Sequence, residues 1–249
     1  MKELREDTDS MEQERLNLFT GHFGSGKTEI AVNYAIRSAK AGRKTILVDL
    51  DIVNPFFRST EVKGQLDAFG VRVISPNFAS TTVDVPSLPA EVYSVFADKS
   101  ARIIFDVGGD EVGARALGQY FPYFRAEPYR LFYVINIRRP LSANREDILE
   151  MLRDVERNSR LEVTDLINNT NLSYETTVYD IIEGQALVAQ ISQAVRKPVA
   201  YIAGARELLK ELPEQLPEDT GCALFPIERF MKPPWDGVVG TVPESETQD

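Results

Sequence analysis

The fold is decided by one stretch, Gly21-His22-Phe23-Gly24-Ser25-Gly26-Lys27-Thr28. It matches the pattern G-x-x-x-x-G-K-[ST] at every fixed position and predicts a phosphate-binding loop. Its glycines let the backbone curl so that amide N–H groups point at phosphate oxygens, and the following helix N-terminus adds partial positive charge. We expect all eight residues to line a nucleotide, with Lys27 reaching the β- and γ-phosphates and Thr28 binding Mg²⁺.

The sequence on both sides of this loop supports the motif. An apolar run at Leu16, Leu18 and Phe19 precedes it and is typical of a strand. Apolar residues then recur at helical spacing from Ile30 to Ala39, before Gly42. Strand, glycine loop and helix therefore follow in the order that a phosphate-binding loop requires.

Strands and helices alternate along the rest of the chain. This alternation predicts an α/β fold, doubly wound, with a mostly parallel sheet of about seven strands and helices on both faces. Polar signatures follow several of these strands, where ligands bind in such sheets. After the first strand, we expect strands at 44–49, 71–74, 102–106, 130–136, 163–167 and 199–203. After the helix that follows the loop, we expect helices at 90–98, 111–120, 144–157 and 178–195.

Composition divides the chain into three parts. Residues 1–15 are charged and poor in large apolar side chains, which predicts a flexible tail. Residues 16–211 carry the strand–helix alternation and form the predicted nucleotide-binding domain. Residues 212–249 are rich in proline, so we expect an irregular C-terminal extension whose last residues are disordered.

Charge and cysteine usage exclude several functions. The 249 residues carry a formal net charge of −10, which argues against general nucleic-acid binding. The chain has one cysteine, Cys222, which excludes an internal disulfide and a cysteine-rich zinc site. No signal peptide and no apolar run of membrane-spanning length is recognisable. We therefore expect a soluble, cytoplasmic protein that binds no membrane.

Acidic residues close two of the predicted strands. Asp49 and Asp51 alternate at one strand end, so one of them can face the nucleotide and either hold Mg²⁺ or orient the attacking water. Asp106 closes another apolar strand and is expected to coordinate Mg²⁺, followed at D-x-x-G spacing by Gly109, whose N–H can approach a γ-phosphate. For the first pair the alternative is two solvated acids, and for Gly109 it is ordinary turn chemistry.

An asparagine-rich segment follows the sixth predicted strand. Asn168 and Asn169 can read a base edge, because an amide supplies both a donor and an acceptor, or they can stabilise a local turn. The segment lacks the N-K-x-D pattern that selects guanine, since Asn171 stands where an aspartate is required. ATP is therefore the expected nucleotide. Arg138 and Arg139, after the fifth strand, can reach phosphate or a neighbouring subunit, or form a solvated turn.

With these residues in hand, the chain resembles the MinD/ParA/Mrp group of P-loop ATPases, relatives of the nitrogenase iron protein. GHFGSGKT aligns without gaps on the family's GKGGxGKT, VDLDIVNP on its Asp-x-Asp strand end, and FDVGG on its Asp-x-x-Gly switch. The resemblance covers roughly residues 16–204 and implies ATP hydrolysis within a homodimer, switched by a protein partner. It implies catalytic roles for Lys27 and Asp51, Mg²⁺ binding by Thr28, Asp49 and Asp106, and a switch at Gly109.

The chain also departs from that family. The family's signature lysine, which crosses to the partner's nucleotide, falls at His22. The switch segments lack the bridging cysteines of the iron protein, so a subunit-bridging iron–sulfur cluster is not expected. The prolines near the C-terminus forbid a long amphipathic helix of the MinD kind.

Three functions remain open from the sequence. The first is a Mg-dependent ATPase whose ATP or ADP state gates association with an unidentified protein partner. The second is an ATP-dependent small-molecule kinase or ligase, similar to dethiobiotin synthetase or the cobyrinate amidases. Its second pocket would lie in the polar loop from Asn77 to Pro89. The third is a non-hydrolysing nucleotide-binding assembly factor.

Overall fold

The computed structural model describes residues 14–51, 60–75, 90–140, 142–212 and 221–230. Most of the predicted N-terminal tail, the loop between Asn77 and Pro89 and the C-terminal residues from 231 onward lie outside these ranges. The predictions made for those segments therefore remain predictions.

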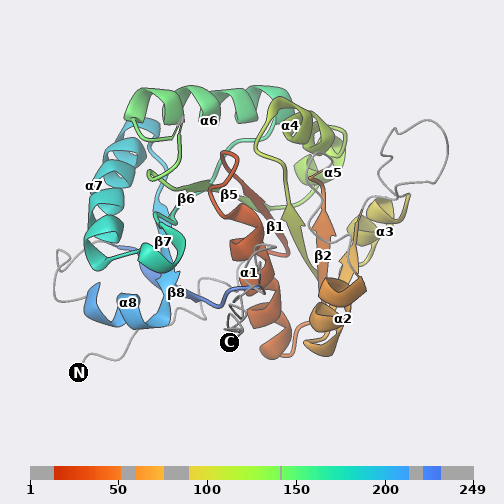
Figure 1. The fold of residues 1–249 in the computed structure, drawn as a ribbon. Helices are drawn as coiled ribbons and strands as arrows, with labels where there is room; N and C mark the ends of the chain where they lie inside the picture. Colours follow the sequence, from red (N-terminus) through yellow and green to blue (C-terminus); the bar gives the residue numbers. More distant parts are fainter. Residues whose placement is uncertain (1–13, 52–59, 76–89, 141, 213–220, 231–249) are drawn as a thin grey trace, which may run out of the picture.

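The described elements build one all-parallel sheet of eight strands in the order β3-β2-β4-β1-β5-β6-β7-β8 (Figure 1). The strand before the phosphate loop, β1, lies inside the sheet between β4 and β5. This confirms the predicted α/β fold class. The strands are β1 (Leu16–Thr20), β2 (Thr45–Asp49), β3 (Val71–Ile74), β4 (Arg102–Asp106), β5 (Tyr129–Ile135), β6 (Asp165–Asn168), β7 (Val199–Ala205) and β8 (Ala223–Ile227).

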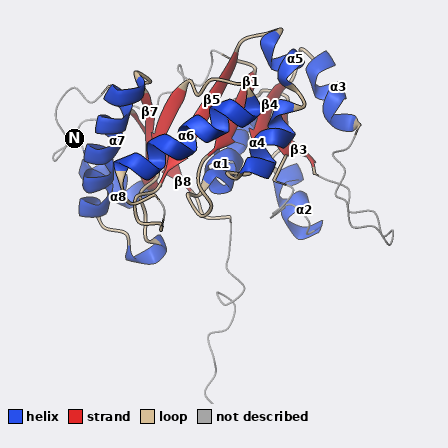
Figure 2. Cartoon of the chain, turned by 90° about the horizontal axis from the view of Figure 1, so that it is seen from above, coloured by secondary structure: helices blue, strands red, loops and turns tan. Residues whose placement is uncertain are grey.

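Helices cover both faces of the sheet (Figures 1 and 2), and α6 runs between α4 and α7. Each face needs this cover because side chains alternate along a strand. Leu16 and Leu18 of β1 pack on the face of α3 to α7, whereas Phe19 packs on the face of α1 and α2. The helices are α1 (Lys27–Lys40), α2 (Thr60–Ala68), α3 (Glu91–Ala97), α4 (Glu111–Gly118), α5 (Phe121–Arg125), α6 (Arg145–Ser159), α7 (Val178–Val195) and α8 (Arg206–Glu211).

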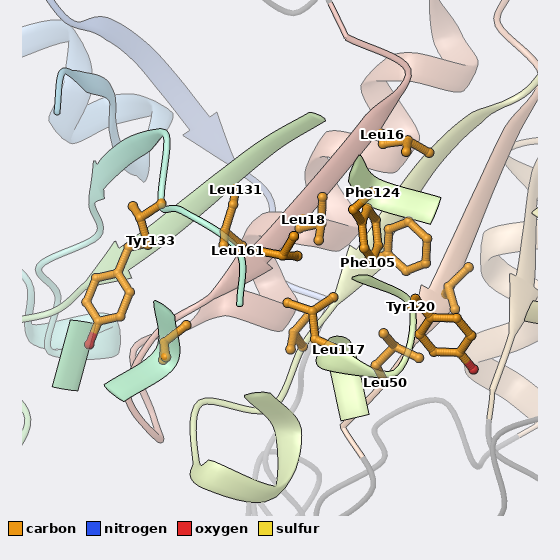
Figure 3. Packing of buried hydrophobic residues seen from close by; sticks show 14 of the residues in the cluster. Leu16, Leu18, Leu50, Phe105, Leu117, Tyr120, Phe124, Leu131, Tyr133 and Leu161 are labelled. Atoms are coloured by element: carbon orange, nitrogen blue, oxygen red, sulfur yellow. The ribbon is translucent and has the colours of Figure 1, made fainter. Parts of the chain in front are cut away.

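The two large apolar clusters lie on opposite faces of the sheet, and a third, smaller cluster lies between β7, α7 and α8. Figure 3 shows part of the first, in which Leu18 lies beside its β5 neighbour Leu131. On the opposite face Phe19 stacks on Phe132, with ring centroids 4.8 Å apart, and both rings contact Tyr34 of α1. The strands are buried on both sides, as expected for a parallel sheet. Within the described helices none is long and apolar enough to cross a membrane.

Strand β8 is the main difference from the sequence-based expectation. We predicted an irregular segment after Pro213, yet 223–227 pair in parallel with β7 and complete the sheet. Pro226 cannot donate to a ladder, so it suits a strand at the edge of the sheet, which β8 is. Helices α2, α5 and α8 were also not anticipated. The strand extends the sheet into the predicted C-terminal extension, while the proposed division into domains stays a prediction.

The segment that contains β8 also forms hydrogen bonds with helix α1. The side-chain amide of Asn33 donates to the carbonyl of Glu228 and accepts from its N–H, both at 2.8 Å. The Arg37 guanidinium donates to the Pro226 carbonyl at 2.5 Å and lies over the Phe225 ring. The helix that begins in the phosphate loop is thus anchored to a strand almost two hundred residues later.

Candidate functional site

The glycine loop has the conformation that a phosphate-binding loop needs. Gly21, Gly24 and Gly26 have φ angles of 149°, 75° and 86°, a region that residues with a Cβ rarely adopt. Lys27 is the first residue of α1, so the N-terminus of this helix opens directly onto the loop. The unpaired N–H groups at such a helix end favour an anion.

Two neighbouring segments contact the loop. A Cβ placed on Gly109 would lie 1.8 Å from the Gly21 carbonyl oxygen, so the segment after β4 touches the loop through bare backbone. From the end of β6, the Asn169 amide donates to the Ser25 carbonyl at 2.7 Å. Gly109, predicted as a phosphate-sensing residue, is therefore in direct contact with the loop.

A buried ion pair lies at the start of α1. Lys27 Nζ is 3.3 Å from Asp51 Oδ2, and both side chains are almost fully buried. The backbone N–H of Asp51 donates to Asp49 Oδ1 at 2.9 Å, which joins the two predicted acids. Removing one member of a buried pair leaves an uncompensated charge and costs about 3–5 kcal/mol. The structure thus brings the two predicted catalytic residues together beside the loop.

Asp106, at the end of β4, is a buried acid of the site with a raised pKa. Its side chain is buried in a residue that is 1 % exposed, and burial raises its pKa to about 6. The positive charge of Lys27 and the nearby Thr28 hydroxyl lower this pKa, while Asp51 raises it further. Neither carboxylate oxygen has full hydrogen-bond geometry to any described residue. Asp106 is therefore costly to keep ionised here without a cation.

These oxygens suit Mg²⁺. Carboxylate and hydroxyl oxygens are its preferred ligands, and in phosphate-binding sites one or two carboxylates act together with phosphate oxygens. Thr28 and Asp106 supply this donor set, with Asp49 next to them on β2, the strand that pairs with β4. In the described ranges no three His, Cys, Asp or Glu side chains group to hold a metal alone.

Buried oxygens without a hydrogen-bond partner among the described residues lie in the loop and at the carboxyl ends of strands of the sheet. Each such group costs about 1–3 kcal/mol, so native structures contain few of them and each calls for an explanation. They come from the loop itself and from the carboxyl ends of β1, β4 and β6. In addition to the Asp106 oxygens they are Thr20 Oγ1, Ser25 Oγ, Asn169 Oδ1 and Thr170 Oγ1. Their concentration at this edge of the sheet indicates a site for a polar ligand.

The two asparagines at the carboxyl end of β6 make different contacts. Asn168 is fully buried, and its amide donates to the Ile181 carbonyl and to Gln185 and accepts from the Thr170 N–H. These bonds favour the turn-stabilising alternative for Asn168. Asn169 contacts the phosphate loop, and its base-reading role stays a prediction.

Phe23 and Gly24 are the most exposed residues of the loop. Phe23 is 68 % exposed, and His22 is half-buried with Nδ1 2.9 Å from the Phe23 carbonyl oxygen. Because a carbonyl group only accepts hydrogen bonds, Nδ1 carries the proton in this contact. The loop therefore presents an aromatic ring to solvent.

One residue of the site was missed by the sequence analysis. Asn136, which follows β5, is fully buried, and its amide oxygen accepts from the N–H groups of Arg138 and Asn171. Its amide nitrogen donates to the Asn171 carbonyl. Asn136 thereby joins the segments after β5 and β6. Its only sequence signal is a polar residue at the carboxyl end of an apolar strand.

Comparison with known proteins places the fold. No protein-family model and no curated protein matches the sequence. The signal recognition particle receptor FtsY from Elizabethkingia anophelis is 21% identical, with a TM-score of 0.50 over 77% of this chain and 59% of that chain. FtsY from Thermotoga maritima is 19% identical, with a TM-score of 0.49 over 76% and 60%. FlhF complexed with GTP/Mg²⁺ is 12% identical, with a TM-score of 0.46 over 75% and 63%.

These similarities correct the family resemblance drawn from the sequence. The neighbour FtsY is a signal recognition particle receptor and belongs to a P-loop family different from MinD/ParA, so the assignment to MinD/ParA/Mrp is wrong. The match to FtsY establishes the fold of P-loop nucleotide-binding proteins. This chain spans less than two thirds of the length of each of the three neighbours.

Proposed function

We propose that this chain binds a nucleoside triphosphate with Mg²⁺ at the glycine loop and hydrolyses its terminal phosphate. The observation that carries the proposal is the set of buried, unbonded oxygens around the loop, above all the carboxylate of Asp106 beside Thr28. A bound Mg²⁺ would neutralise developing charge between the phosphates. A bound triphosphate would give these groups the polar partners that burial otherwise denies them.

The two members of the Lys27–Asp51 pair would have different roles in hydrolysis. Phosphate oxygens compete with Asp51 for the ammonium of Lys27, which then stabilises negative charge on the transferred group. The freed Asp51 carboxylate can accept a hydrogen bond from a water molecule and orient it toward phosphorus. A new P–O bond forms between the terminal phosphorus and the water oxygen as the bond from that phosphorus to the leaving nucleoside diphosphate breaks.

We further propose that the nucleotide is ATP. The argument rests on the segment 168–171, which offers amides and a hydroxyl but no carboxylate. Guanine is selected by a carboxylate that accepts two hydrogen bonds from its N–H groups, and an amide reproduces this less well. Partner association controlled by the nucleotide state also belongs to the proposal. The exposed Phe23 would sit at the contact, since a change in the loop would reach this ring first.

Replacing Lys27 tests nucleotide binding. We expect Lys27→Ala to abolish binding of ATP·Mg²⁺ in isothermal titration, and the wild type to prefer ATP to GTP. Because Asp51 would lose its partner, the fold is checked by circular dichroism, and Lys27→Gln, which can still donate to Asp51, serves as a second variant. Unchanged affinity in both folded variants contradicts the proposed site, and a tenfold preference for GTP contradicts the choice of base.

Replacing Asp51 separates hydrolysis from binding. Asp51→Asn keeps the size of the side chain and removes its charge, so we expect ATP to bind while single-turnover hydrolysis slows by about 10- to 1000-fold. Asp49→Asn is measured beside it, because the two acids are joined by a hydrogen bond. A full rate in Asp51→Asn, with a loss in Asp49→Asn, would transfer the water-orienting role to Asp49.

A further inference from the structure

The two arginines after β5 point to different tasks. The Arg138 guanidinium donates to Asp180 at 2.9 Å and to Glu183 at 2.5 Å, both on α7. Arg139 instead lies over the glycine loop, where its Nε donates to the Gly24 carbonyl at 3.0 Å. Although the two arginines are adjacent in sequence, Arg138 binds helix α7 and Arg139 contacts the phosphate loop.

The backbone around Arg139 is held in place. The Ser142 hydroxyl donates to the Asn136 carbonyl at 2.8 Å, and the Ser142 N–H donates to the Arg139 carbonyl at 3.2 Å. Asn136 in turn fixes the N–H of Arg138. A turn fixed at both ends presents the exposed Arg139 side chain at the loop with little freedom to lose.

The ends of this guanidinium remain available. A guanidinium has five N–H donors, and the bond to Gly24 uses only the one on Nε. Within the described part of the chain, Nη1 and Nη2 of Arg139 make no hydrogen bond and no carboxylate pairs with them. The planar pair of terminal nitrogens is the geometry that binds phosphate through two parallel hydrogen bonds.

The charge of the site favours such a group. Two buried carboxylates, those of Asp51 and Asp106, lie near the buried ammonium of Lys27. A triphosphate with one Mg²⁺ is itself an anion, so it would enter a site of its own sign. Loop N–H groups and the helix end offset only part of this repulsion. Arg139 is a second cation at this loop, in contact with the Gly24 carbonyl.

We propose that Arg139 is a phosphate-binding residue, which binds the triphosphate held by the glycine loop as a second cation beside Lys27. The inference rests on the proposed function, since it names a further group of the same site. Its Nε keeps the bond to Gly24, and its terminal nitrogens bind a phosphate oxygen pair.

The experiment is isothermal titration of ATP·Mg²⁺ into wild type, Arg139→Ala, Arg139→Lys and Arg157→Ala, between 50 and 300 mM KCl. We expect Arg139→Ala to weaken binding by about 10- to 100-fold and to flatten its salt dependence, because one charged contact is lost. Arg139→Lys keeps the charge but loses the fork, so it should recover part of the affinity and the steep salt dependence. Arg157, exposed on α6, controls for the loss of a charge and should bind as wild type.

Thermal melting of the unliganded variants separates phosphate binding from support of the loop. Melting of Arg139→Ala within about 2 °C of wild type, together with a smaller rise on adding ATP·Mg²⁺, supports the proposal. Wild-type affinity in Arg139→Ala overturns it. So does equally weak, salt-insensitive binding in Arg139→Lys and Arg139→Ala, since the Gly24 contact would then be what matters. If Lys27→Ala abolishes binding while Arg139→Ala does not, the proposed function stands and the role of Arg139 fails. If the wild type binds no nucleotide, both fail.

Discussion

The buried carboxylate of Asp106 favours a bound cation, and it lowers the stability of the unliganded protein at neutral pH. Its pKa is raised to about 6 in the folded protein, chiefly by burial, from an ordinary value of 3.8. The folded chain therefore holds a proton between these two values that the unfolded chain has released. The stability contributed by this group falls as the pH rises from about 4 to 6, and at pH 7.5 the ionised acid costs on the order of 1–3 kcal/mol.

From this sign we expect Asp106→Asn to stabilise the unliganded protein at pH 7.5. The gain should be several degrees in melting temperature, should shrink as the pH falls below about 6 and should be small near pH 4. The same variant should lose most of the stabilisation that ATP·Mg²⁺ gives to the wild type. Differential scanning fluorimetry across this pH range measures both effects. Asp67→Asn, an exposed acid of α2, is the matched control. A lower melting temperature for Asp106→Asn at pH 7.5 would show that its carboxylate supports the unliganded fold.

At the scale of elements, the site is a junction of five segments, which follow β1, β2, β4, β5 and β6. Parallel pairing brings the carboxyl ends of these strands to one edge, and backbone contacts then set their spacing. The closest is that of Gly109 with the Gly21 carbonyl oxygen, where there is no room for a methyl group. A change at this contact must move either the phosphate loop or the segment before α4.

We therefore expect Gly109→Ala to fold while losing at least about tenfold in ATP affinity, because a 1.8 Å approach cannot be tolerated without displacement of the loop. Titration calorimetry and thermal melting measure the two effects. Gly64→Ala is the matched control, since a Cβ at Gly64 of α2 meets nothing within 4 Å and alanine favours a helix. Wild-type affinity in Gly109→Ala would mean that the position of the loop does not depend on this contact.

For the whole molecule, the sequence predicts the architecture well because both of its signals are local. Apolar strand cores and the glycine loop can each be recognised within about eight residues, and their alternation defines a parallel sheet. Strand β8 escaped because Pro226 argues against a strand unless the strand lies at an edge, which depends on the rest of the sheet. The family resemblance failed for a related reason. The loop motif encodes phosphate binding, which many P-loop families share, so it cannot distinguish among them.

The site itself was predictable only in part. Lys27, Thr28 and Asp106 stand where the motif and the strand ends require, since their positions follow from sequence spacing. The different tasks of Asn168 and Asn169 could not be read, because adjacent amides point to opposite sides of a strand end. Only the fold tells that Asn168 faces α7 and Asn169 the loop.

The anchoring of α1 by the segment around β8 has a consequence for synthesis on the ribosome. Asn33 and Glu228 exchange two hydrogen bonds across a sequence separation of 195 residues. Asn33 of the helix that carries Lys27 is translated well before its partner Glu228, which follows only after a further 195 residues. Contacts between residues so far apart in sequence form late and slow the folding of a domain. Until then, the nascent phosphate loop has its glycines and its lysine, but helix α1 lacks its hydrogen bonds to Glu228.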